Sequence, residues 1–265
     1  MIVCVKQVPD VTEFKINKET NTIIREGNVS IINPFDTYAL EESLRIKEKL
    51  GGEVTAISMG IPSVAELLRE AIALGVDQGI LLSDKAFAGA DTLATAYTLS
   101  MGIKKIGEYD LIICGKQSTD GDTAQVGPCL AEKLNIPHTT NVRKIEEIRE
   151  GTIRCQRIND NGYEIVEMSL PAVITVIKEI NTPRLPSIKG ILKAKRANVH
   201  VWNALDIHAN KSLCGLSGSP TQVVGTFVPM HDVNTEIFQG EIRQQVKQLI
   251  DKLSLLNFRF SDRRE

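Results

Sequence analysis

Residues 110–128 read DLIICGKQSTDGDTAQVGP. In this stretch the apolar residues 111–114 run directly into Gly115, and a loop rich in hydroxyls, carboxylates and glycines follows. A continuous apolar run is typical of a strand that is buried on both faces of a parallel sheet. A polar loop at the end of such a strand is typical of a ligand contact. The loop has neither the spacing of a Walker P-loop nor the three glycines of the dinucleotide fingerprint, so its ligand has to be argued from other residues.

Strands and helices alternate regularly on the N-terminal side of this stretch. Strand patterns cover residues 1–6, 53–60, 77–83 and 109–115, and helix patterns cover residues 33–52, 62–75, 90–107 and 122–135. Four alternations within about 135 residues, joined by short connections, predict an α/β fold with an open, doubly wound, mainly parallel sheet. Asn33 is the predicted N-cap of the first helix. The buried stripe of this helix is predicted to consist of Tyr38, Leu40, Leu44, Ile46 and Leu50.

A polar insertion interrupts the alternation at residues 11–32, and its apolar residues around NKETN predict a small hairpin. Beyond Pro137, residues 151–170 predict two strands around a turn at residues 159–162. The apolar run 171–177 predicts a further buried strand.

The C-terminal part of the chain has a different pattern. The stretch NTPRLPSIKGILKAKR, residues 181–196, predicts an exposed loop and a short helix. Residues 197–233 have no sustained period and predict an extended arm. Residues 234–257 predict an amphipathic helix with Ile237, Ile242, Val246 and Ile250 on one face. We therefore expect an α/β domain over residues 1–196, followed by an arm and a C-terminal helix over residues 197–265.

Composition narrows the classes of function. The chain of 265 residues has a formal net charge of −2, which argues against nucleic-acid binding, since that needs a strongly basic face. Its five cysteines are widely spaced without C-x-x-C, so neither a disulfide framework nor a metal site is favoured. Cys4 and Cys114 lie in apolar runs and are expected to be reduced and buried. The sequence shows neither a signal peptide nor a membrane-spanning run, and we expect a cytoplasmic protein.

The ends of the predicted strands carry the candidate ligand groups, because ligands of open α/β sheets bind there. The segments concerned are residues 6–10, 33–36, 58–60 and 115–127. The last leads into a helix predicted to begin near Asp122 or Thr123, whose N–H groups favour a phosphate. Ser118 and Thr119 add hydroxyls, whereas Asp120 and Asp122 are expected to cap the helix or to reach a ribose. A nucleotide site and a well-capped turn without ligand both remain open.

Two further groups of residues have alternative interpretations. Asp91 is the predicted N-cap of the helix over residues 90–107, and Thr92 and Thr95 on its first turn are either ligand donors or ordinary helix residues. The basic set at residues 184–196 is either a solvated face or a docking surface. The neighbouring prolines and the apolar Leu185, Ile188 and Ile191 favour docking. A catalytic triad is not supported, because G-x-S-x-G is absent and the histidines lie outside the strand ends.

Taken together, five motifs resemble the β-subunit family of electron transfer flavoproteins. They are VKQVPD, NPFDTYALEESLRIKEK, CGKQSTDGDTAQVGP, LPAVITV and NTPRLPSIKGILKAKR, in the family's order and spacing over nearly the whole chain. The resemblance implies an adenine-nucleotide-binding α/β fold and a heterodimer with an α subunit that carries FAD. In the respiratory branch the β subunit holds a structural AMP. In the bifurcating branch it holds a second FAD, which takes a hydride from NADH. One electron then passes to ferredoxin or flavodoxin, and the other passes through the α-subunit FAD to a dehydrogenase, such as acyl-CoA or lactate dehydrogenase.

The branch is indicated by two features. Pro9-Asp10 and the D-T-x-A-T pattern that begins at Asp91 resemble bifurcating members. AMP held as a structural ligand remains the alternative to FAD. A third interpretation, a nucleotide-binding stress-type protein of the same fold, would not explain residues 181–196 or the arm.

The resemblance also assigns roles to single residues. It places around the adenosine Cys4, Asn33, Pro34, Phe35, Asp36 and Met59. It places around the phosphates Gly115, Lys116, Gln117, Ser118, Asp120, Gly121, Asp122, Thr123, Ala124, Gln125, Val126 and Gly127. It places towards the flavin Lys6, Pro9, Asp10, Asp91, Thr92 and Thr95. The partner-docking residues of the recognition loop, about 181–196, are Arg184, Leu185, Ile188 and Lys193, with Ile188 as the apolar anchor. The arm would wrap the α subunit, and catalysis belongs to the cofactor, with no catalytic side chain and no metal.

Overall fold

The computed structural model describes residues 1–10, 16–17, 22–23, 30–224 and 235–256. The chain divides into two units, Met1–Gln222 and Val223–Glu265. The first unit contains the sheet, and the second contains one described helix, α6 (Ile242–Leu255). None of the described helices is both long enough and apolar enough to cross a membrane.

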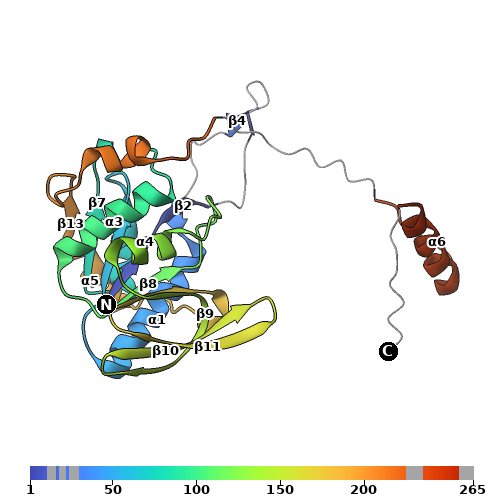
Figure 1. Cartoon of the computed structure of the whole chain (residues 1–265), viewed down its shortest axis with the longest axis horizontal. Helices are drawn as coiled ribbons and strands as arrows, with labels where there is room; N and C mark the ends of the chain where they lie inside the picture. The colour runs from blue at the N-terminus through green and yellow to red at the C-terminus, as the bar shows by residue number, and fades with distance from the viewer. Residues whose placement is uncertain (11–15, 18–21, 24–29, 225–234, 257–265) are drawn as a thin grey trace. The chain divides into compact units, whose positions relative to one another are not determined.

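The first unit is built on a nine-stranded sheet in the order β11-β10-β9-β12-β8-β1-β6-β7-β13 (Figure 1). Its strands are β1 (Ile2–Cys4), β6 (Thr55–Met59), β7 (Gln78–Leu82), β8 (Leu111–Gly115), β9 (His138–Arg149), β10 (Thr152–Asn159), β11 (Gly162–Ser169), β12 (Ala172–Val176) and β13 (Val199–Trp202). From β9 through β12, β8, β1, β6 and β7 to β13, each strand is parallel to the next. Only β9, β10 and β11 pair in antiparallel fashion, as a ribbon at one end of the sheet. The expected mainly parallel sheet is confirmed.

Helices cover both faces of this sheet. The core on one face joins α1 (Pro34–Leu50), α2 (Val64–Leu74) and α5 (Ile188–Arg196) to the strands. The core on the other face joins α3 (Thr92–Ile106) and α4 (Val126–Leu134) to them. Short 3₁₀ turns are η1 (Lys85–Phe87), η2 (Lys178–Ile180), η3 (Lys211–Leu213) and η4 (Gly215–Gly218). This double layer confirms the doubly wound arrangement, with strands such as β1 and β12 buried along their whole length.

The predicted hairpins are present. In the insertion, β3 (Ile16–Asn17) pairs with β4 (Thr22–Ile23), and β2 (Gln7–Pro9) pairs with β5 (Ser30–Ile32). Of the apolar residues around NKETN that predicted this hairpin, Phe14 and Ile24 lie outside the described residues. The second predicted hairpin is the β10–β11 pair, whose turn connects Asn159 to Gly162.

The region after residue 196 differs from the sequence prediction. Instead of an arm, β13 adds an edge strand beside β7, and the buried Ala204, Ile207 and Cys214 join the core on the α3 side. The first unit therefore continues to Gln222. The helical prediction from residue 234 also began too early, because Gly240 has a φ of 113° and α6 starts only at Ile242. Ile237 consequently precedes the helix.

The start of α1 touches the end of β8. A Cβ atom on Gly115 would overlap the Asp36 carboxylate and Phe35, so only glycine allows this approach. The backbone N–H of Lys6 donates to Asp36 Oδ2 at 2.8 Å. Burial raises the pKa of Asp36 to about 7, although hydrogen bonds from Asn33, Lys6 and Gly115 act in the opposite direction. One tightly packed junction thus joins β1, β8 and α1. Leu50, at the far end of α1, is 54% exposed, so it does not belong to the predicted buried stripe.

We expect Gly115→Ala to destabilise the protein by roughly 1–3 kcal/mol, because the added methyl group has to displace Asp36 and Phe35. Urea unfolding measures the change. Gly121→Ala in the same loop is the matched control, since its Cβ meets only the Ser118 hydroxyl at 3.2 Å. Equal losses of stability in the two variants would contradict the close approach.

Asp36 is expected to make stability fall as pH rises. The folded protein keeps a proton on Asp36 up to about pH 7, whereas the unfolded chain releases it near the usual pKa of 3.8. The contribution is complete below pH 3.8 and is lost as pH passes 7. Asp36→Asn should therefore show a shallower fall in the free energy of unfolding between these two limits. Asp160→Asn, in the exposed β10–β11 turn, should keep the wild-type slope. Identical slopes for wild type and Asp36→Asn would refute a protonated Asp36.

Candidate functional site

The carboxyl ends of β1 and β8 lie at a topological switch point. From β1 the chain moves through α1 and α2 to β6 and β7 on one side of β1. It then returns through α3 to β8 on the other side of β1. Ligands of open α/β sheets bind in the crevice that such a reversal opens. The loops that follow β1 and β8 both leave the sheet at this switch point.

Lys6 contacts the loop after β8. Its ammonium lies 2.6 Å from Asp120 Oδ1 and 3.4 Å from Ser118 Oγ. Burial pushes the pKa of Asp120 upward, but the hydrogen bonds from Lys6 and Ser118 and the charge of Lys6 together outweigh it and hold the pKa below its usual value. Both side chains remain partly open to solvent. The switch point therefore holds a cation whose present partner an incoming anion could replace.

Asn33 fixes the same loop to the start of α1. It is buried at the N-cap position, but its side chain makes no cap hydrogen bond. Instead, Nδ2 donates to Gln117 O at 2.8 Å, and Oδ1 accepts from Thr119 N at 3.2 Å. The predicted capping role of Asn33 is therefore wrong for the side chain, which holds the loop after β8.

The loop before α4 is shaped by left-handed residues. Asp122 and Ala124 have φ values of 50° and 54°, so α4 begins at Val126 rather than near Asp122 or Thr123. Asp120 and Asp122 do not cap the helix as predicted, because they bind Lys6 and Gln117 instead.

Three successive amides of this loop remain available to an anion. Within the described chain, the amides of Thr123, Ala124 and Gln125 have no protein acceptor. Consecutive N–H groups around a left-handed residue form an anion-binding concavity. Gly127 has a different role, since a Cβ there would overlap Thr175 of β12.

The start of α3 reaches this loop through Thr92, whose hydroxyl donates to Gln125 Oε1 at 2.9 Å. The predicted N-cap at Asp91 is confirmed, since Oδ1 accepts from the amides of Leu93 and Ala94 at 3.0 Å. Asp91 Oδ2 accepts from Thr221 N at 3.1 Å. Burial tends to raise the pKa of Asp91, but these hydrogen bonds outweigh it and lower the pKa. The carboxylate is thus engaged by backbone, and Thr92 is the residue of this pair that reaches the loop.

The remaining predicted residues surround the switch point less directly. Cys4 and Cys114 are buried partners on adjacent strands, and the hydrogen bond between them, together with burial, raises the pKa of Cys114 well above its usual value. Met59 ends β6 and is partly buried, and Thr95 donates its backbone N–H to Asp91 O. Pro9 is exposed in the β2–β5 ribbon. Of the other members of the predicted set, Pro34 and Val126 are the first residues of α1 and α4. Lys116 and Gly121 lie in the loop after β8, and Asp10 directly follows β2.

A nucleotide fits this donor set. The Ser58 hydroxyl, buried near the end of β6, has no partner within the described chain. A buried hydroxyl of this kind needs a ligand or water to satisfy it. With the Lys6 ammonium and the amides of residues 123–125, the site offers polar groups both to a base or sugar and to a phosphate. Ser58 lies in the strand-end segment 58–60 that the sequence indicated, but its lack of a partner is visible only in the packing.

Two hollows of the described surface lie beside α1 and α2. One of about 540 Å³ is lined by α1 and the β9–β10 ribbon. The other, of about 710 Å³, lies between α2 and α5. Neither hollow is lined by the loop at residues 115–127. These hollows come from helix packing, and no sequence pattern indicated them.

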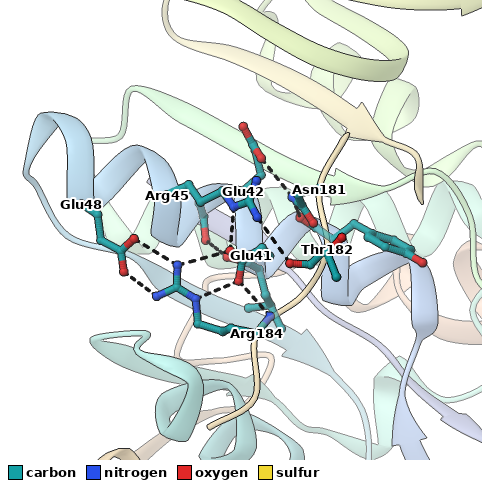
Figure 2. A network of polar contacts seen from close by, with 10 residues as sticks. Glu41, Glu42, Arg45, Glu48, Asn181, Thr182 and Arg184 are labelled. Carbon is teal, nitrogen blue, oxygen red and sulfur yellow. Dashed lines mark hydrogen bonds and ion pairs between the residues drawn. The ribbon is translucent and has the colours of Figure 1, made fainter. Parts of the chain in front are cut away.

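The predicted docking residues divide into two groups. Leu185 and Ile188 are 89% and 80% exposed, and Lys193 is also exposed. Arg184, in contrast, turns onto α1, where Nε donates to Glu41 Oε2 at 2.8 Å and a second ion pair joins it to Glu48 (Figure 2). Because the Arg184 side chain is still 32% exposed, its docking role stays a prediction.

The chain is similar to known proteins over nearly its whole length. The electron transfer flavoprotein domain matches residues 20–207. The electron transfer flavoprotein subunit beta of Thermoanaerobacterium thermosaccharolyticum is 51% identical over 96% of this chain and 97% of its own length. The protein of the same name from Clostridium acetobutylicum is 44% identical over 96% and 97%. The caffeyl-CoA reductase-Etf complex subunit CarD of Acetobacterium woodii is 45% identical over 96% and 97%. The parallel sheet, its switch point and these matches together show that the chain belongs to the electron transfer flavoprotein family, as a β subunit.

Proposed function

We propose that this β subunit binds FAD at the switch point between β1 and β8. The observation that carries the proposal is the loop at residues 123–125, whose amides lack acceptors within the described chain and lie in the connection that Lys6 contacts. Backbone donors and an ammonium are the groups that hold the phosphates of a nucleotide. Lys6 and these amides would hold the pyrophosphate. Asn33 would keep the loop in place through its bonds to Gln117 and Thr119.

Thr92 supports FAD over a smaller nucleotide. It brings the N-terminus of α3 to the loop, and a helix N-terminus favours negative charge such as that of a reduced flavin. Bound FAD would supply hydride acceptance from NADH and the separation of the electron pair. The residues of this chain would set the position, charge and solvent exposure of the ring. The relative from Acetobacterium woodii is named as part of a reductase complex, which is consistent with this role.

The complete complex would then distribute electrons in the cytoplasm. We infer a heterodimer with an α subunit that carries a second FAD. One electron would pass to ferredoxin or flavodoxin, and the other would pass through the α subunit to a dehydrogenase. The second unit supports this pairing, because α6 carries the apolar Ile242, Val246 and Ile250 along one face. Such an apolar helix face is typical of a helix that packs on a partner.

AMP is the second candidate, and the Lys6–Asp120 ion pair favours it. A cation that is already neutralised adds little attraction for a pyrophosphate, whereas a monophosphate can be held by the amides alone. In that case the β subunit would bind its nucleotide structurally, and the heterodimer would carry one flavin.

Nucleotide content distinguishes the two candidates. We expect the purified heterodimer to release two FAD and no AMP on denaturation, measured by chromatography and absorbance. One FAD and one AMP for each heterodimer would refute the FAD proposal. Thr92→Val should lower the flavin content towards one FAD, because it removes the hydroxyl that joins α3 to the loop. Thr152→Val in β10, at the other end of the sheet, should keep both flavins.

Ile188 is proposed as the main anchor for the partner dehydrogenase. Its exposed side chain lies at the first position of α5, and interfaces concentrate binding energy in a few such anchors. Ile188→Ala should raise the KM of the dehydrogenase for the heterodimer by roughly tenfold, as loss of an anchor worth about 1.4 kcal/mol predicts. Two partner enzymes are tried, an acyl-CoA dehydrogenase and a flavin-dependent lactate dehydrogenase. The KM is measured with the one that the wild-type heterodimer reduces faster.

Leu205→Ala provides the control for this docking test. Leu205 is a similarly exposed aliphatic residue in the first unit, outside residues 181–196. It should leave the KM unchanged. A normal KM for Ile188→Ala would remove residues 181–196 from the docking surface.

A further inference from the structure

Polar bonds from α1 hold the docking loop, defined here as residues 181–187. Asn181 Nδ2 donates to Tyr38 O at 3.0 Å and to Glu42 Oε2 at 2.9 Å. Arg45 Nη2 donates to Thr182 O at 3.4 Å. Figure 2 shows these groups converging from α1 and the loop. The docking loop is therefore fixed at several points although it contains no regular secondary structure.

The centre of this network is the Glu41 carboxylate, whose side chain is only 4% exposed. Arg184 reaches it with its backbone N–H at 3.1 Å and with Nε at 2.8 Å. Arg45 Nε lies 2.7 Å from the other carboxylate oxygen. Burial tends to raise the pKa of Glu41, but the arginine hydrogen bonds outweigh it and hold the pKa below its usual value. Glu41 therefore stays charged inside the protein.

Stability alone does not explain a buried charge of this kind. An apolar pair of similar volume is often as stable as a buried ion pair, because removing two charges from water is costly. What an arginine adds is direction, since its planar fork fixes the geometry of the carboxylates that it binds. Arg184 uses the fork fully by joining Glu41 on one side and Glu48 on the other. The network is thus suited to hold the loop in one conformation.

The fixed loop carries the most exposed apolar residues of the region. Leu185 follows Arg184 directly, and Ile188 begins α5 after the cap formed by Ser187, whose Oγ accepts from Gly190 N at 3.0 Å. Ordering a flexible segment on binding reduces affinity, whereas a segment that is already ordered avoids this loss. The network therefore orders the segment that carries these apolar residues before the partner binds.

We propose that Arg184 is a positioning residue for docking. Together with Glu41 and Glu48 it holds the docking loop so that Leu185 and Ile188 enter an apolar pocket on the partner dehydrogenase without further ordering. This inference rests on the docking role proposed above for Ile188. It assigns Arg184 to the presentation of the anchor rather than to direct contact with the partner.

The test uses Arg184→Met in the complete heterodimer and measures two quantities. Amide hydrogen exchange at residues 182–188 should become at least about tenfold faster. The KM of the dehydrogenase for the heterodimer should rise about fivefold, whereas kcat at saturation should stay at the wild-type value. Arg184→Lys, which keeps the charge but loses the fork, should fall between wild type and Arg184→Met.

The matched control is Arg157→Met. Arg157 also forms an ion pair with a glutamate, Glu164, and it donates in addition to Thr140 O, but it lies in β10, away from the docking loop. It should leave both quantities at wild-type values. If Arg184→Met lowers the yield of folded heterodimer, Glu48→Gln weakens the same network from the exposed side and should shift both quantities in the same direction.

Ile188→Ala, alone and combined with Arg184→Met, distinguishes failure of the docking proposal from failure of the positioning role of Arg184. When Arg184→Met and Ile188→Ala are combined, the KM should rise by less than the product of the single effects, because both act on one anchor. If Ile188→Ala leaves the KM unchanged, the docking proposal fails and this inference fails with it. If Ile188→Ala raises the KM but Arg184→Met leaves either exchange or KM unchanged, only the positioning role of Arg184 is overturned.

Discussion

The contact between the end of β8 and the start of α1 is the constraint on which the candidate site depends. Gly115 lets the two segments meet, and Asp36 joins them to β1 through the backbone of Lys6. Because β1 and β8 lie at the switch point, this contact places the two flanking loops side by side. A larger residue at position 115 would overlap Asp36 and Phe35, the residues of α1 that make this contact. Packing at one glycine thus determines the arrangement of the polar groups above it.

Helix α1 carries two buried carboxyl groups, and their surroundings affect the charge of each group differently. Asp36 has few countercharges, and burial raises its pKa to about 7, which favours a neutral group at moderate pH. Glu41 lies between two arginines, whose hydrogen bonds overcome burial and keep it charged. The first lies at the end of the helix that is proposed to face the nucleotide, and the second holds the loop that is proposed to dock a partner. One helix therefore links the two proposed sites.

The sequence predicted the elements with strong periodicity and missed those set by single dihedral angles or distant contacts. Alternating runs indicated the parallel sheet, and the resemblance indicated which strand ends would meet. The later start of α4 depends on left-handed backbone at Ala124, which residue type does not reveal. The strand β13 is four residues long and lacks a period, so it resembled a linker. The ion pair between Arg184 and Glu41 was not predicted, because the two residues lie 143 positions apart in the chain.

The short strand β13 also has a protective consequence. It pairs with β7, whose residues 79–82 are buried, and so covers backbone groups that would otherwise form the open edge of the sheet. Open edges of apolar strands pair readily with other chains and promote aggregation. A fragment that ended at Arg196 would look complete by its sequence pattern, yet it would expose this edge. A fragment that keeps this edge covered therefore extends to Gln222, where the first unit ends after β13 and the turns that follow it.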